Sequence, residues 1–192
     1  MIVVFGFLLV LVAIQLFDGD LGRIASVRLQ GQWLVVVALA IQVAITTVLA
    51  DAVSGDVGDA LHLVSYGAAA VFFVVNRRVA GMITVGVGGA LNLAAIIANG
   101  GVMPASRWAV RTAGIPIRPD EFANSQALAN PRLLVLGDVF AVPNGWPFNN
   151  VFSVGDVVLL VGAFHVLFVA CRCRRPRWLA RLLLQQAPQQ LR

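Results

Sequence analysis

Apolar residues dominate five runs of the chain, and shorter polar stretches separate them. A run of about 20 apolar residues with few charges is typical of a transmembrane helix. We therefore predict an all-α, polytopic transmembrane helical bundle of about five spans. The predicted spans are Ile2–Phe17, Trp33–Ala50, Ala60–Val75, Ala80–Ala98 and Ser153–Ala170.

Two of the runs, Ile2–Phe17 and Ala60–Val75, are short. As helices they would be about 24 Å long, against a hydrocarbon core of about 30 Å. We count both as spanning because flanking residues can reach the interface and a bilayer can thin. Ile2–Phe17 has an alternative as a cleaved signal peptide, but it lacks the basic start and the small-residue cleavage site of one.

Composition agrees with this fold class. Hydrophobic residues make up 59% of the 192 residues, and charged residues only 12%, with a mean hydropathy of +0.87. Ordinary globular chains carry about 25% charged residues. All fourteen basic residues are Arg, and they cluster beside apolar runs rather than on a soluble face, which argues against a nucleic-acid partner. The two cysteines, Cys171 and Cys173, are too few for a disulfide framework or a metal centre, and we expect no cofactor.

Arginine placement predicts the orientation. Arg77 and Arg78 form the link between the third and fourth runs, and Arg172, Arg174, Arg175, Arg177 and Arg181 follow the fifth run. The loop "DAVSGDVGD" after the second run has three Asp and no Arg. The positive-inside rule then predicts a multi-pass protein of the cell (inner) membrane, with its N-terminus outside and its C-terminus in the cytoplasm.

The remaining segments complete the predicted organisation of a single membrane domain, residues 1–192. Residues 99–152 hold six of the eight prolines, so we expect one ordered extracytoplasmic segment rather than a long helix. Residues 171–192 are predicted to form a basic amphipathic tail on the cytoplasmic side. A solvated tail is the equally weighted alternative.

Polar residues within the predicted spans gather toward their outer ends. Such groups tend to face the interior of a bundle, so they could line one outward-facing polar pocket. The alternative is that they simply hydrogen-bond neighbouring helices, and that Gly81 and Gly88 allow close helix packing. The candidate pocket residues are Gln42, Thr46, His62, Tyr66, Asn92, Asn99 and Ser153.

Asp156, in "FSVGDVV", has two interpretations. Ser153 and Asp156 are three residues apart at a helix start, which predicts a capping box that closes the helix. The competing hypothesis pairs Asp156 with Asp138 as two catalytic carboxylates. A low-dielectric pair can split into one acid and one base, as a hydrolase requires.

The stretch "FSVGDVVLLVG" resembles the second aspartate motif of lipoprotein signal peptidases, and "GGALNL" resembles the run before their first catalytic aspartate. This resemblance implies a membrane aspartyl hydrolase, but no Asp-Arg follows "GGALNL" here. As a whole, the chain resembles a bacterial five-span family of unknown function, through the pieces "NGGVMP", "LGD" and "FSVGD". That resemblance implies a fold and no activity.

We therefore expect a non-enzymatic role, as a scaffold or accessory subunit or as a binder of lipid or another amphiphile. Its expected partners are membrane lipids and a second membrane protein. The alternatives are an aspartyl hydrolase using Asp138 and Asp156, and a small-molecule permease, which the lack of paired halves weakens.

Overall fold

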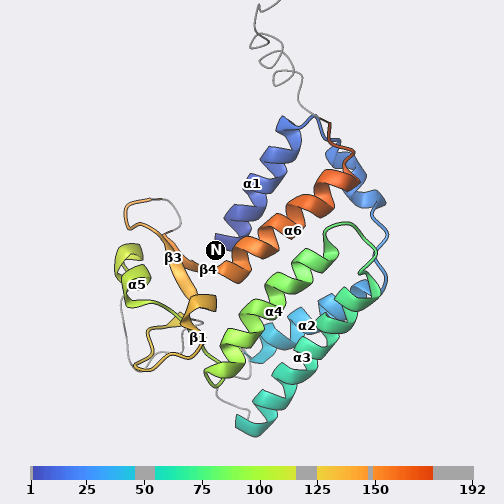
Figure 1. Cartoon of the computed structure of the whole chain (residues 1–192). Helices are drawn as coiled ribbons and strands as arrows, with labels where there is room; N and C mark the ends of the chain where they lie inside the picture. Colours follow the sequence, from blue (N-terminus) through green and yellow to red (C-terminus); the bar gives the residue numbers. More distant parts are fainter. Residues whose placement is uncertain (1, 46–54, 116–124, 147–148, 175–192) are drawn as a thin grey trace, which may run out of the picture.

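The computed structural model describes residues 2–45, 55–115, 125–146 and 149–174. The apolar runs form helices that lie against one another (Figure 1). α6 lies between α1 and α4, and α2 packs on α3. The main helices are α1 (Ile2–Leu16), α2 (Gln32–Val43), α3 (Gly55–Val75), α4 (Met82–Ala98) and α6 (Val154–Ala170).

The predicted polytopic transmembrane fold is wrong. Within the described residues, no helix combines the length and the apolar character needed to cross a membrane. Length is the physical reason in three of the five runs, because α1, α4 and α6 have between 15 and 17 residues. At 1.5 Å per residue these helices are only about 22 to 26 Å long. The predicted multi-pass inner-membrane location required these spans, and it is wrong for the same reason.

The all-α prediction is also wrong, because the described residues 99–115, 125–146 and 149–153 form a small lobe that contains β-structure (Figure 1). β1 pairs in parallel with β2, and β3 pairs antiparallel with β4. Pro104 and the other prolines break long helices but are compatible with short strands and turns. The lobe comprises β1 (Met103–Pro104), α5 (Arg107–Ala113), β2 (Ser125–Gln126), η3 (Leu134–Leu136), β3 (Asp138–Val142) and β4 (Asn150–Ser153).

The helix α5 gives the lobe its core. Ser106 caps the start of the helix by accepting a 3.1 Å hydrogen bond from the Ala109 N–H. Gly114 ends the helix in the left-handed region, at φ 65°, where a glycine is tolerated without strain. Between these caps, α5 buries one face against β3 and β4. The buried cluster consists of Ala105, Ala109, Val110, Ala113 and Val151.

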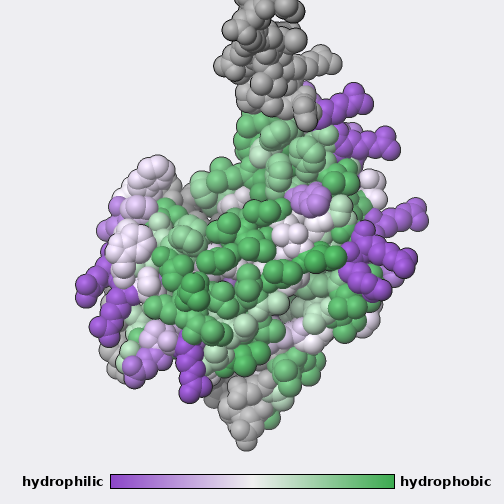
Figure 2. All heavy atoms as spheres, viewed as in Figure 1, coloured by the Kyte–Doolittle hydropathy of each residue, from purple (hydrophilic) through white to green (hydrophobic). Residues whose placement is uncertain are grey.

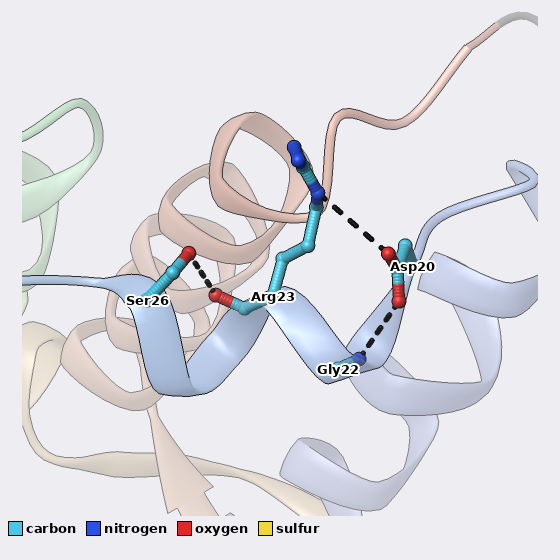
Figure 3. Close-up of polar contacts among 4 residues, drawn as sticks. All are labelled: Asp20, Gly22, Arg23 and Ser26. Atoms are coloured by element: carbon cyan, nitrogen blue, oxygen red, sulfur yellow. Dashed lines mark hydrogen bonds and ion pairs between the residues drawn. The ribbon is translucent and has the colours of Figure 1, made fainter.

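The other end of the molecule is closed by η1 (Leu21–Ser26), shown in Figure 3. Asp20 accepts a 3.0 Å hydrogen bond from the Gly22 N–H and forms a 3.6 Å ion pair with Arg23. The Asp20 N–H donates to the Cys171 carbonyl at 3.0 Å, which ties η1 to the end of α6. Cys171 is buried among apolar side chains of α1 and α6, and this burial raises the pKa of its thiol.

α4 and α6 pack closely against each other at glycines of both helices. These are Gly88 on α4, and Gly155 and Gly162, seven residues apart, on α6. An added Cβ at Gly88 would lie 2.6 Å from the Leu159 nitrogen and 2.7 Å from the Gly155 carbonyl oxygen. One at Gly162 would lie 2.5 Å from the Val85 nitrogen. Backbone packs directly on backbone here, so the predicted close packing at Gly88 is confirmed.

We predict that Gly88→Ala lowers the free energy of unfolding by about 2 kcal/mol, because its methyl group meets backbone that cannot move aside. The matched control is Gly89→Ala, one residue along the same helix, where nothing lies within 4 Å of an added Cβ. That change should raise stability by about 0.5–1 kcal/mol through helix propensity alone. Thermal unfolding followed by circular dichroism measures both, and equal effects of the two changes would contradict the close packing.

Candidate functional site: a polar junction between two helices and the small lobe

The polar junction begins at the first turn of α6. Ser153 is fully buried and forms the capping box that its spacing predicted. Its Oγ accepts a 3.0 Å hydrogen bond from the Asp156 N–H, and the Asp156 carboxylate accepts one of 3.0 Å from the Ser153 N–H. The cap satisfies two backbone donors that the helix start would otherwise leave unpaired.

Asn92 on α4 completes this junction. Its Nδ2 donates to Asp156 Oδ1 at 2.9 Å, and its Oδ1 accepts from the Ser153 hydroxyl at 2.7 Å. The three residues therefore form a closed ring of hydrogen bonds, in which the backbone N–H groups of Ser153 and Asp156 complete the two side-chain bonds made by Asn92. Gly155 makes room for it, because an added Cβ there would overlap Asn92 Oδ1.

Asp138 reaches the same region from β3. It is 4% exposed, and its Cα pairs with that of Ser153 across the two-stranded sheet. Directly opposed residues present their side chains on the same face of a sheet. A bulge follows at once, since the register shifts between Asp138 and Phe140. Asp138 and Asp156 thus lie on neighbouring elements, Asp138 on the strand that pairs with Ser153 and Asp156 in the first turn of α6.

The Asp156 carboxylate has a specific structural task. Its Oδ1 binds the Asn92 amide and its Oδ2 binds the Ser153 backbone. Each oxygen is held by a donor that the fold supplies, and the Ser153 hydroxyl is engaged both as donor and as acceptor. These hydrogen bonds tie the start of α6 to α4, and we call them the helix-to-helix lock. Among the described residues, no group of His, Cys, Asp and Glu side chains could hold a metal ion.

The other predicted pocket residues form separate contacts. Asn99, at the end of α4, donates to the Arg132 carbonyl at 2.7 Å and accepts from the Arg132 N–H at 2.8 Å. Gln42 on α2 donates to the buried Ser65 hydroxyl of α3 at 2.6 Å. Tyr66 follows Ser65 and is half-buried.

Two of the predicted pocket residues cannot be placed in this way. Thr46 lies outside the described residues, and so does most of the predicted basic tail, from residue 175 onward. His62 lies within α3, but its side chain is outside the described part. Their pocket roles stay predictions.

Asn76 was missed by the sequence reasoning, although it is 3% exposed and its side chain makes three hydrogen bonds. It donates to the Gln30 carbonyl at 2.9 Å, accepts from the Gln30 N–H at 2.8 Å and donates to the Phe72 carbonyl at 2.8 Å. Asn99 repeats this pattern at the end of α4, where it also bonds the Ala95 carbonyl. The available signal was an Asn just after an apolar run, a position that closes helix ends.

Residues 26–168 match a protein family described as a family of unknown function, DUF5317. The match covers most of the described helices and the small lobe. It agrees with the predicted family of unknown function and gives no support to the resemblance to lipoprotein signal peptidases. No curated protein and no solved structure matches the chain significantly.

We predict that Asp156→Asn lowers the free energy of unfolding by about 1–3 kcal/mol. An amide presents one acceptor and one donor, so either Asn92 Nδ2 or the Ser153 N–H loses its partner. The matched control is Asp20→Asn at the start of η1, where Asn caps as well as Asp does, and where the side chain is 67% exposed. Chemical denaturation measures both variants, and an unchanged midpoint for Asp156→Asn would contradict the lock.

Proposed function

The chain belongs to this family of unknown function, and we propose that it is a non-enzymatic protein that binds lipid or another amphiphile. The proposed binding surface is the exposed apolar face of its helices, which would take up acyl chains. One observation carries the proposal, namely that large aliphatic side chains point outward on every main helix.

These exposed side chains lie on all five helices rather than on one. Leu63 on α3 is 70% exposed and Leu39 on α2 is 62% exposed. Figure 2 shows hydrophobic residues covering the helical part of the visible face, with hydrophilic ones toward its edges. Further members of this set are Leu8, Leu9, Val12, Leu16, Val36, Val64, Val74, Ile83, Ile97 and Val161.

Burial of this exposed apolar surface against a ligand would be energetically favourable. Contiguous exposed apolar patches larger than a few hundred Å² mark sites of interaction. Burying an exposed Leu or Val side chain contributes about 1.5–3 kcal/mol. The exposed side chains are mainly aliphatic and present no hydrogen-bonding group, so flexible hydrocarbon chains can cover them without leaving a polar group unpaired.

We predict that the double substitution Leu39→Ser and Leu63→Ser weakens association with phosphatidylcholine vesicles about tenfold or more. Both side chains point outward, so the folded core keeps its contacts while two apolar contacts with lipid are lost. Vesicle flotation measures the bound fraction, and circular dichroism shows that the helices remain.

The matched control is Val135→Ser on η3 of the small lobe. Val135 is 69% exposed but belongs to the small lobe and not to a main helix, so its loss should leave flotation unchanged. If the wild-type protein does not bind vesicles but co-purifies with a protein partner in a fixed ratio, it is instead an accessory subunit. That result would overturn the lipid proposal.

Aspartyl hydrolysis is a second candidate, and the burial of Asp138 beside Ser153 favours it. In this proposal Asp138 acts as the base that activates water, and Asp156 acts as the acid that protonates the leaving group. Asp156 could act only if its bonds to Asn92 and Ser153 opened.

For this second candidate, Asp138→Asn and Asp156→Asn should each abolish hydrolysis of fluorogenic peptides by the purified protein, because either change removes one of the two proton-transfer groups. Asn92→Ala supplies the control, since it disturbs the junction and leaves both carboxylates in place. Absence of hydrolysis by the wild-type protein, or full activity of Asp138→Asn, ends the hydrolase proposal.

A further inference from the structure

Three arginines from two segments that are distant in sequence are brought to the turn between α3 and α4. Arg77 and Arg78 directly follow Asn76, and Arg28 lies two residues before Gln30. The paired hydrogen bonds between Asn76 and the Gln30 backbone hold these two segments together. Because Asn76 is buried, the clamp is shielded from water and fixes the position of this basic turn.

This arginine cluster, Arg28, Arg77 and Arg78, carries positive charge that no ion pair within the described part of the chain offsets. All three are exposed, and no carboxylate of the described residues forms an ion pair with any of them. Arg23 differs, because Asp20 pairs with it at 3.6 Å (Figure 3). Like charges held side by side favour an anion between them.

The surroundings of the arginine cluster indicate which anion it would take. Val74 and Val75 at the end of α3 and Ile83 at the start of α4 are exposed apolar residues next to the turn. Trp33, at the start of α2, is 65% exposed and suits the boundary between apolar and polar surroundings. In Figure 2, hydrophilic side chains line the edge where Figure 1 draws this turn, next to the hydrophobic face.

We propose that the arginine cluster binds the phosphate of an anionic lipid headgroup, whose acyl chains lie on the adjacent apolar face. This inference rests on the proposed lipid binding and adds the headgroup class. Guanidinium groups bind phosphate oxygens in pairs through a planar fork. Arg77 already donates one Nη1 bond to the Val74 carbonyl at 2.9 Å, which holds its guanidinium at the helix end.

The continuity of charge and apolar surface favours a lipid over a free phosphate or a nucleic acid. A soluble phosphate would make no contact with the exposed apolar side chains of Val74 and Ile83. A lipid can cover these side chains with its acyl chains while its headgroup binds the arginine cluster. Each arginine near an anionic lipid surface contributes about a fivefold preference.

The experiment compares flotation with phosphatidylcholine vesicles and with vesicles that also contain phosphatidylglycerol, for the full chain at fixed ionic strength. The wild-type protein should prefer the anionic vesicles. The triple substitution Arg28→Gln, Arg77→Gln and Arg78→Gln should remove that preference, by about fivefold per arginine, and leave binding to phosphatidylcholine unchanged.

The matched control is the pair Arg107→Gln and Arg111→Gln on α5 of the small lobe. Both are exposed arginines with no ion pair among the described residues, yet they lie on a different part of the molecule. The control should keep the anionic preference. Loss of preference in the control, or its retention in the triple variant, overturns the inference while the proposed function stands. Should the triple variant misfold, the single variants Arg28→Gln and Arg78→Gln replace it.

Two further outcomes separate the sources of phosphate and the two proposals. If millimolar inorganic phosphate abolishes the preference when chloride of equal ionic strength does not, the site takes free phosphate and the lipid assignment is overturned. If the wild-type protein floats with neither vesicle, the proposed function itself fails, and this inference fails with it.

Discussion

The structure depends on the contact between α4 and α6, which closes through glycine backbone at its centre and through three polar side chains at its end. Gly88 and Gly155 bring the helices so close that Asn92 can reach Ser153 and Asp156. A hydrogen bond among buried groups gains strength from its low-dielectric surroundings, and it costs much to leave unmade. The small lobe then builds on this fixed point, because β4 ends at Ser153.

The junction and the apolar surface represent two different uses of the same helices. On the inside, the helices meet through small residues and a few satisfied polar groups, which specify one arrangement. On the outside, they present aliphatic side chains such as Leu39 and Leu63 with nothing in the described chain to cover them. The lipid proposal follows from this contrast, and the arginine cluster would add a preference for negative charge.

Local patterns in the sequence were enough to predict helices near all five apolar runs and the capping box at Ser153 and Asp156. Composition was misleading for the membrane fold, because apolar content does not set the length of a helix, and α1 and α6 have only 15 and 17 residues. The strands around Asp138 were missed, since cross-strand pairing depends on partners far apart in the chain. For the same reason, no local signal could show that Asn92 meets Asp156.

The twin asparagine clamps have a consequence for how this family can diverge. Asn76 and Asn99 hold Gln30 and Arg132 by their main-chain N–H and C=O groups alone. Every residue except proline offers the same two groups. Evolution can therefore exchange the residues at positions 30 and 132 freely, while each asparagine is hard to replace. Across homologues, these two tertiary contacts would persist without any covariation between the positions that they join.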